Sequence, residues 1–212
     1  MKKKLNVLVV CERSGKVREA FRKRGHNAYS CDLVPADDNS PYHYIRDALL
    51  AIKAPWDLLI AHPTCTYLCN SGVSWLYEGP SGHNAERWAA LSKAIAFFNE
   101  LKWADHIPFR ALENPIPHGY AVSGIGRYNQ LIQPYMFGHA ESKATCLWLH
   151  NLPKLVPTND VKARWKSLPK KDAQRLHYLS PSPQRARLRS ETFQGIADAM
   201  AEQWGDYVSK QL

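Results

Sequence analysis

The sequence lacks any apolar run close to the roughly 20 residues that a membrane-spanning helix needs. Its apolar stretch at residues 5–11 is short and leads into Glu12 and Arg13 without a cleavage pattern of small residues. Internal repeats and low-complexity tracts are absent as well. These absences argue against a membrane protein, an exported protein and a disordered chain, so we expect a cytoplasmic protein with no membrane partner.

Cysteines and acidic residues are also few. Five cysteines is an odd number in a chain of 212 residues, which can bury a core without disulfide staples, so we expect reduced thiols. The 19 Asp and Glu residues are outnumbered by 28 Lys and Arg, which gives a net charge of +9. This excess favours a polyanionic partner, although a solvated basic surface would produce the same charge.

What the sequence does contain is an alternation of short apolar runs with helical patterns. Residues 5–10 form an aliphatic run typical of a strand buried in a parallel sheet, and a helix over 14–24 leads to a strand over 27–31. This pattern predicts one α/β sheet with helices on both faces. The other expected strands are 43–45, 57–61, 109–112, 131–136 and 146–149, the other expected helices are 85–103 and 193–210, and residues 66–82 are expected as a long loop able to act as a lid.

Polar residues follow the expected strands at five places. These are Cys11 with Glu12, Asp32, Asp47, Cys65 and Glu113. Because ligands of open parallel sheets bind beyond the carboxyl ends of the strands, we expect these side chains to share one cleft.

Two of these residues suit covalent chemistry. Cys65 follows a buried strand and a proline-ordered turn, where a thiolate can be presented to a carbon electrophile. Glu113, at the end of the neighbouring strand, could bond a ring nitrogen and supply a proton as the nucleophile adds. The alternatives are a small buried cysteine and a carboxylate that caps a loop.

The other strand ends suit a nucleotide-like ligand. Asp32 stands where an acidic residue would accept hydrogen bonds from ribose hydroxyls, and Asp47 could bond an adenine amino group. The loop from Cys11 to Gly15 offers a helix N-terminus and one glycine for close approach of a ligand. Both aspartates could instead be exposed turn residues.

Four segments carry a resemblance to a known family. Residues 63–65 (Pro-Thr-Cys) resemble a Pro-Cys nucleophile motif, and residues 113–115 (Glu-Asn-Pro) resemble a Glu-Asn-Val motif. Residues 137–145 resemble the pattern Tyr-Gly-x-Pro-Gln-x-Arg-x-Arg with both arginines replaced, and residues 192–197 resemble a terminal motif that packs onto the cofactor site. Through these segments the chain resembles a reduced cytosine-C5 DNA methyltransferase of the small phage or plasmid type.

The resemblance implies a Rossmann-like fold, S-adenosylmethionine as cofactor and DNA as partner, with RNA as a second candidate. It implies that Cys65 adds to cytosine carbon 6 while Glu113 engages ring nitrogen 3, after which carbon 5 accepts the methyl group. The target base would have to leave a duplex stack to reach the pocket. The implied cofactor-binding residues are Cys11, Glu12, Ser14, Gly15, Asp32, Asp47 and Pro63, and the implied substrate-binding residues are Asn114, Pro115, Lys143, Arg185, Arg187 and Arg189.

The resemblance also predicts a division of the chain. We expect a catalytic core over 1–150, a basic loop-rich segment over 151–190 where the family inserts a recognition domain, and a C-terminal helix over 191–212 that packs back on the core. Within 154–190, ten Lys and Arg residues stand against two Asp residues, and four prolines favour an irregular path over the surface. This segment is expected to bind a nucleic-acid backbone with little sequence specificity, unless it is a solvated basic linker.

Two other classes of protein stay open. A zinc nucleobase deaminase would need His-x-Glu followed by Pro-Cys-x-x-Cys, whereas here the order is reversed and the spacing differs. A simpler zinc site could use His62, Cys65 and Cys69, although we expect no metal. The second class is a catalytically weak relative of the methyltransferases that binds nucleic acid or protein, which the substituted motifs favour.

Overall fold

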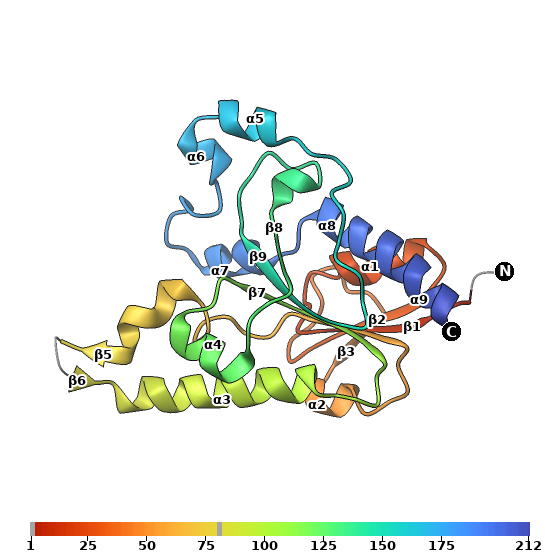
Figure 1. The fold of residues 1–212 in the computed structure, drawn as a ribbon, viewed down its shortest axis with the longest axis horizontal. Coiled ribbons are helices and arrows are strands. Elements are labelled where there is room, and N and C mark those ends of the chain that lie inside the picture. Colours follow the sequence, from red (N-terminus) through yellow and green to blue (C-terminus); the bar gives the residue numbers. More distant parts are fainter. Residues whose placement is uncertain (1–2, 80–81) are drawn as a thin grey trace.

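A seven-stranded sheet forms the centre of the protein in the computed structural model, which describes residues 3–79 and 82–212. The strand order is β3-β2-β1-β4-β7-β9-β8, and β9 runs antiparallel to both of its neighbours (Figure 1). The strands are β1 (Asn6–Val10), β2 (Asn27–Asp32), β3 (His43–Ile45), β4 (Leu58–Ala61), β7 (Phe109–Pro115), β8 (Gln130–Ile132) and β9 (Thr145–His150).

This topology identifies the fold class. The strands β1 to β4 and β7 are parallel, and the order reverses between β1 and β4, as in doubly wound sheets. The antiparallel β9 inserts between β7 and β8, which is the arrangement of S-adenosylmethionine-dependent methyltransferases. The expected Rossmann-like α/β sheet is therefore confirmed.

Helices cover both faces of the sheet and form two cores (Figure 1). The first core contains Phe21, Met200 and Trp204, and the second contains Leu91, Phe98 and Trp148. On the first face lie α1 (Lys16–Lys23), α8 (Gln194–Ala199), the π-helical turn η3 (Met200–Trp204) and α9 (Gly205–Gln211); on the second lie α2 (Ala48–Ala51), α3 (Ala85–Lys102) and α4 (Gly119–Ile125). Since β1 and β4 are buried on both sides, their unbroken apolar runs are accounted for.

Two strand predictions were wrong in their bounds. The strand expected to end at residue 112 continues to Pro115, because Glu113, Asn114 and Pro115 pair with the antiparallel β9. The strand expected over 131–136 ends at Ile132, and Pro134–Met136 form the 3₁₀ helix η2.

The expected lid loop is partly ordered. It contains the 3₁₀ helix η1 (Asn70–Leu76) and a small hairpin of β5 (Tyr77–Glu78) and β6 (Gly82–His83). Residues 80 and 81 of this loop lie outside the described residues. The loop is therefore a folded projection at the carboxyl edge of the sheet.

The irregular path expected for the basic segment is interrupted by three short helices. The segment forms α5 (Lys162–Ser167), α6 (Lys170–Ala173) and α7 (Pro183–Ser190). Ser182 caps α7 by accepting a hydrogen bond from Arg185 N at 3.1 Å, and proline suits the first helical position, which needs no N–H. The ring of Trp165 in α5 stacks on Tyr135 at 4.8 Å, so α5 packs on η2. Proline here starts a helix instead of preventing one.

None of the helices formed by residues 3–79 and 82–212 is long and apolar enough to cross a membrane.

Candidate active site

Cys65 lies in the turn that follows β4. Its carbonyl accepts hydrogen bonds from Leu68 N and Cys69 N at 3.0 Å each, so residues 65–69 form one helical turn. Asn114 Nδ2 in the next strand donates to the carbonyl of Pro63 at 2.9 Å. The Cys65 side chain is half-buried at the sheet edge, as a nucleophile reached by substrate must be.

Glu113 lies on the neighbouring strand, where Ala61 of β4 is in register with Leu112 of β7. Its carboxylate is 15% exposed and contacts His62, with 3.1 Å between Oε2 and Nδ1. Burial raises the pKa of Glu113, but the His62 hydrogen bond and charge, together with Lys143, outweigh burial and hold this pKa below its ordinary value. Glu113 is therefore an anchored carboxylate beside Cys65.

His62 is the main site residue that sequence reasoning assigned only to a metal. Its side chain is 9% exposed, and no described residue provides a hydrogen-bond partner for its Nε2 atom. The Oδ1 atom of Asn114 is likewise buried without a partner among the described residues. Buried polar atoms are usually satisfied, so these two atoms mark a place for a polar ligand. The histidine directly before Pro-Thr-Cys was the available sequence signal.

The Cys65 thiol forms a hydrogen bond with Cys69, and the two titrate as a pair. This hydrogen bond, burial and the Glu113 carboxylate raise the pKa of Cys65. The same hydrogen bond and the Ser71 hydroxyl, 3.0 Å from the Cys69 sulfur, lower the pKa of Cys69 to about 5 despite its burial. The contact therefore raises the pKa of Cys65 and lowers the pKa of Cys69.

Lys143 approaches the same site from the segment before β9. Its Nζ donates to the carbonyl of Glu191 at 2.9 Å. Burial and the Arg189 charge lower the pKa of Lys143, while Glu113 and Cys65 oppose the shift. These mutual effects place Lys143 near the candidate nucleophile and the candidate acid. Pro115 ends β7 opposite Thr145 and adds no polar side chain.

The residues expected to bind the cofactor fall into two groups. In the first group, Asp32 and Asp47 both raise the pKa of Cys11, although burial is the largest cause and brings it to about 12. Both carboxylates therefore lie near Cys11, Asp32 at the end of β2 and Asp47 after β3, where acceptors for a ribose or an amino group are needed. Asp47 also caps α2, accepting from Leu49 N at 2.7 Å.

The second group, Glu12, Ser14 and Gly15, is engaged within the chain. Glu12 is buried, and its carboxylate accepts from Val17 N at 2.6 Å and from Arg18 N at 3.2 Å, at the start of α1. Ser14 Oγ accepts weakly from Lys16 N at 3.4 Å. Gly15 has φ of 70°, and a Cβ there would lie 2.2 Å from the Arg18 guanidinium. The close approach of Arg18 therefore explains why a residue without a side chain stands at position 15.

The arginines of α7 lie on the surface beside this edge of the sheet. Arg187 Nε lies 3.0 Å from Asp37 Oδ2, and Asp37 also pairs with Arg13 at 2.6 Å. Arg189 lies close enough to Lys143 to lower its pKa, and Arg185 follows the α7 cap. The helix α7 therefore crosses the edge that holds Cys65 and Asp32.

The described residues do not support the zinc site that the sequence left open. Within the described ranges, no group of three His, Cys, Asp or Glu residues could hold a metal ion, and His62, Cys65 and Cys69 do not form one.

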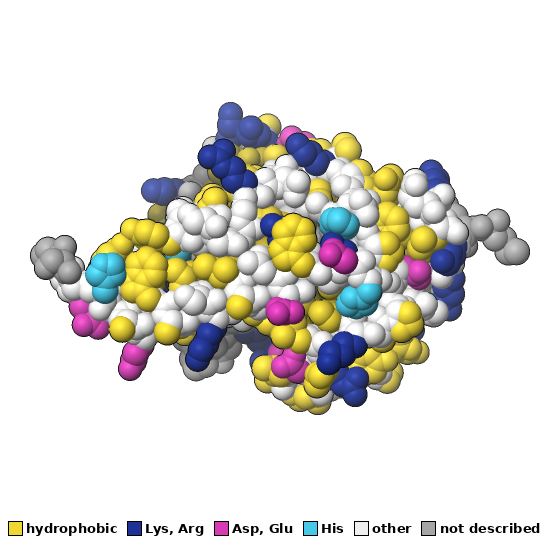
Figure 2. All heavy atoms as spheres, turned by 60° about the horizontal axis from the view of Figure 1, so that its bottom comes forward, with side chains coloured by type: hydrophobic (Ala, Val, Ile, Leu, Met, Phe, Trp, Pro, Cys, Tyr) yellow, Lys and Arg dark blue, Asp and Glu magenta, His cyan; other side chains and the backbone are white. Residues whose placement is uncertain are grey.

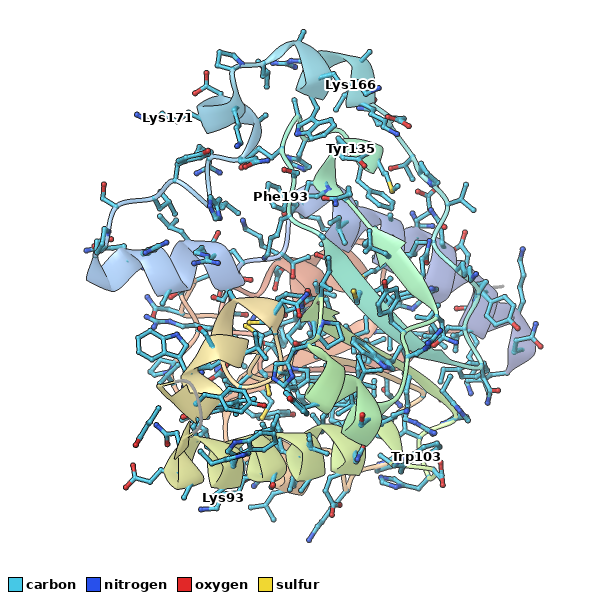
Figure 3. All side chains as sticks on the ribbon, turned by 60° about the vertical axis from the view of Figure 1, so that its left-hand side comes forward. Lys93, Trp103, Tyr135, Lys166, Lys171 and Phe193 are labelled. Carbon is cyan, nitrogen blue, oxygen red and sulfur yellow. The ribbon has the colours of Figure 1, made fainter. Side chains whose placement is uncertain are left out.

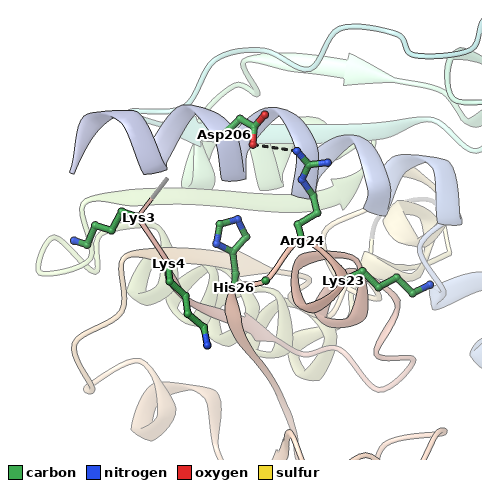
Figure 4. A pocket seen from close by; sticks show the side chains of 7 residues that line it. Lys3, Lys4, Lys23, Arg24, His26 and Asp206 are labelled. Atoms are coloured by element: carbon green, nitrogen blue, oxygen red, sulfur yellow. Dashed lines mark hydrogen bonds and ion pairs between the residues drawn. The ribbon is translucent and has the colours of Figure 1, made fainter. Parts of the chain in front are cut away.

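A cavity of about 290 Å³ at the amino-terminal end of β1 is lined by Lys4, Lys23 and His26, among others, and bordered by the Arg24–Asp206 ion pair of 3.0 Å (Figure 4). It lies away from the strand ends that carry the candidate site.

No family model matches the sequence, and no curated protein sequence is similar to it. Among solved structures, the chain is similar to the Entamoeba histolytica methyltransferase EhMeth (13% identity, TM-score 0.49, 74% of this chain and 58% of that one) and to the S. pombe Dnmt2 methyltransferase (15%, 0.45, 85% and 61%). It is also similar to an E. coli prophage protein with the assigned role of a DNA modification methyltransferase (15%, 0.45, 78% and 56%). The chain spans less than two thirds of each of these proteins. Individual residue roles therefore depend on the geometry above.

Proposed function

We propose that the chain is a DNA cytosine-C5 methyltransferase that uses Cys65 as its nucleophile. One observation carries the proposal: a half-buried cysteine in the turn after β4 lies beside an anchored carboxylate near the end of the adjacent strand β7. A thiol that adds to a ring carbon beside a group that engages the ring nitrogen is the arrangement that this chemistry needs.

In this proposal the chain activates both the attacking thiol and the cytosine ring. Cys65 adds to cytosine carbon 6 as its proton passes to Cys69, the thiolate with which it shares a hydrogen bond. Glu113 takes up a proton from solvent as the base enters and donates it to ring nitrogen 3, while His62 positions Glu113 through their 3.1 Å contact. Once carbon 5 carries the methyl group, its proton passes to solvent water and the C5–C6 double bond re-forms. Cys65 then leaves as a thiolate that regains its proton from Cys69, and ring nitrogen 3 returns its proton to Glu113.

The residues after β1, β2 and β3 fit S-adenosylmethionine in part. The carboxylates of Asp32 and Asp47 have the chemistry to bind ribose hydroxyls and an amino group, whereas Glu12 already holds α1. When bound, S-adenosylmethionine supplies an electrophilic methyl group. Cys11, Ser14, Gly15 and Pro63 would form the walls of this site.

A fluorine trap tests the proposal. Fluorine at carbon 5 cannot leave as a proton, so DNA containing 5-fluorocytosine should remain attached to Cys65 after methyl transfer. We expect peptide mass spectrometry to find the adduct at Cys65, Cys65→Ser to abolish it, and Glu113→Gln to slow it by about 10²-fold, the lower end for acid catalysis. An adduct at Cys69, or full methylation by Cys65→Ser, would refute the assignment.

The raised pKa of Cys65 favours a second candidate, a methyltransferase-like protein that binds nucleic acid with little catalysis. Transfer of labelled methyl groups to DNA and to RNA separates the two candidates. Binding without transfer to either polymer would support the second one.

A further inference from the structure

An aromatic surface lies beside the candidate site. It consists of Tyr77, His83, Trp88 and Tyr120, whose rings contact one another, and of the exposed Trp75 in η1, two residues before Tyr77. Trp88 packs edge-on against Tyr120 at 5.0 Å and against Tyr77 at 6.2 Å, and the Tyr77 and Tyr120 hydroxyls are hydrogen-bonded. Figure 2 shows hydrophobic side chains and a histidine gathered at the end of the molecule where Figure 1 places β5 and β6.

The rings of this surface remain open to solvent. Trp75 is 67% exposed, Tyr120 46% and Tyr77 36%. Packing of the hairpin does not require so much exposed ring area, and grouped exposed apolar residues mark interaction sites.

The aromatic surface is tied to the turn that carries Cys65. Arg87, one turn into α3, donates from Nη2 to the carbonyl of Thr66 at 2.9 Å and lies over the Tyr67 ring at 4.4 Å. His118, which caps α4, lies with Nε2 2.9 Å from the Tyr67 carbonyl. The residues just after Cys65 are therefore held by the same two helices that carry Trp88 and Tyr120.

Charge indicates what this surface binds. Glu78 and Glu86 flank the rings and would repel phosphate groups, whereas Lys143 and the α7 arginines supply cations on the other side of Cys65. A chain with phosphates at α7 and bases on the rings matches this division, because base–aromatic stacking and a cationic track together bind single strands. In a duplex both faces of each base are covered by the neighbouring bases, so the rings of this surface could not stack on them.

We propose that the aromatic surface stacks unpaired bases next to the target cytosine, so that the substrate is single-stranded DNA. The inference rests on the proposed function for the identity of the target base. It explains how a chain without room for a recognition domain holds its substrate near Cys65.

Oligonucleotide binding tests the proposal directly. Fluorescence anisotropy would compare a labelled single strand, the matching duplex and an RNA strand of the same sequence, with the Cys65→Ser variant as host so that no chemistry intervenes. We expect single-stranded DNA to bind about tenfold or more tightly than duplex, and Trp75→Ala to weaken it by about 5- to 150-fold, the range for one stacked base. Trp75→Phe should restore most of the affinity.

The matched control is Trp103→Ala. Trp103 is 59% exposed and lies at the opposite end of α3 from the hairpin (Figure 3), so its loss should leave the affinity unchanged. Equal binding of duplex and single strand, tighter binding of RNA, or no effect of Trp75→Ala would overturn the proposal. So would a Trp75-dependent self-association with unchanged DNA affinity. If the protein binds single strands as expected but the fluorine trap gives no adduct, the proposed function is refuted and the role of the aromatic surface is not. If the Trp75→Ala variant forms the adduct equally well on duplex DNA, the role of the aromatic surface is refuted and the proposed function is not.

Discussion

At the residue scale, the hydrogen-bonded pair of cysteines decides how the candidate nucleophile is activated. Cys65 alone would be a poor nucleophile, since its hydrogen bond to Cys69, its burial and a nearby carboxylate all raise its pKa. The same hydrogen bond lowers the pKa of Cys69 to about 5, which suits Cys69 to accept the proton as Cys65 attacks. The nucleophile and its base are then separated by one helical turn.

The first prediction follows from this pair. In the wild type, adduct formation with 5-fluorocytosine DNA should be level above about pH 6 and should fall as the pH drops through 5, because Cys69 then gains a proton. In Cys69→Ser the hydroxyl cannot accept the proton, so the rate at pH 7 should fall by about 10²-fold and rise tenfold per pH unit. The adduct rate measured from pH 4 to 10 checks this. A flat profile at the wild-type rate in Cys69→Ser would mean that Cys69 is not the base.

A second prediction at this scale concerns the carboxylates of Asp32 and Asp47. The double substitution Asp32→Asn and Asp47→Asn removes both charges, but an Asn at position 47 can still cap α2. Calorimetry should show S-adenosylmethionine binding about 5- to 150-fold more weakly, as for 1–3 kcal/mol of lost hydrogen bonding. Asp206→Asn, at the opposite end of the sheet, is the control. Unchanged affinity in the double variant would remove this cofactor assignment.

At the element scale, α7 is the helix that carries cations to the site. Its arginines face the loop after β2 and Lys143, whereas Lys166 of α5 and Lys171 of α6 lie on the outer part of the molecule (Figure 3). The same basic segment therefore presents two surfaces, of which only one adjoins Cys65.

This difference gives a third prediction. Replacing Arg185, Arg187 and Arg189 by Ala should flatten the dependence of log K on log salt by about 2, at about 0.7 per phosphate contact for single strands. Replacing Lys166, Lys170 and Lys171 removes the same charge and should leave the slope unchanged. Anisotropy titrations from low to moderate salt measure both variants. Equal flattening in the two variants would show that net charge, not α7, determines binding.

The elements also show what the sequence could predict. Strands β1 and β4 were found from apolar runs because both of their faces are buried, so local pattern and tertiary environment agree. The end of β7 was missed because its pairing with β9 is non-local. Arg110 in the same strand is fully buried, and three carbonyls and the Asp105 carboxylate satisfy its guanidinium, which composition cannot reveal.

The candidate site divides in the same way. The convergence of Cys65 and Glu113 follows from strand order, so the topology rule was enough to predict it. The internal bonds of Glu12 depend on side-chain geometry at the start of α1, and the His62–Glu113 contact depends on the register of two strands. Neither has a sequence signal of its own.

At the scale of the whole molecule, the two ends of the chain share one core. Trp204, in the π-helical turn between α8 and α9, is fully buried in the core that also contains Leu5 and Phe21. Its indole N–H donates to the carbonyl of Pro153 at 2.9 Å, and Ser209 Oγ donates to the carbonyl of Lys3 at 2.9 Å. The C-terminal helices therefore cover the same face of the sheet as α1. Whether residues 191–212 form a separate unit, as the expected division of the chain implies, can be tested by whether the whole chain unfolds cooperatively.

The fourth prediction is that the whole chain unfolds as one unit whose stability depends on Trp204. Trp204→Ala leaves a large cavity and should lower the free energy of unfolding by about 3 to 5 kcal/mol. Trp204→Phe keeps most of the volume and leaves the Pro153 carbonyl without its donor, so it should cost less, about 1 to 3 kcal/mol. Urea titrations followed by far-UV circular dichroism and by tryptophan fluorescence should coincide for each variant, since a single cooperative transition gives the same midpoint with any probe. If residues 191–212 formed an independent unit, Trp204→Ala would instead produce an early transition that removes only part of the helical signal, while the midpoint of the remaining sheet stayed at its wild-type value.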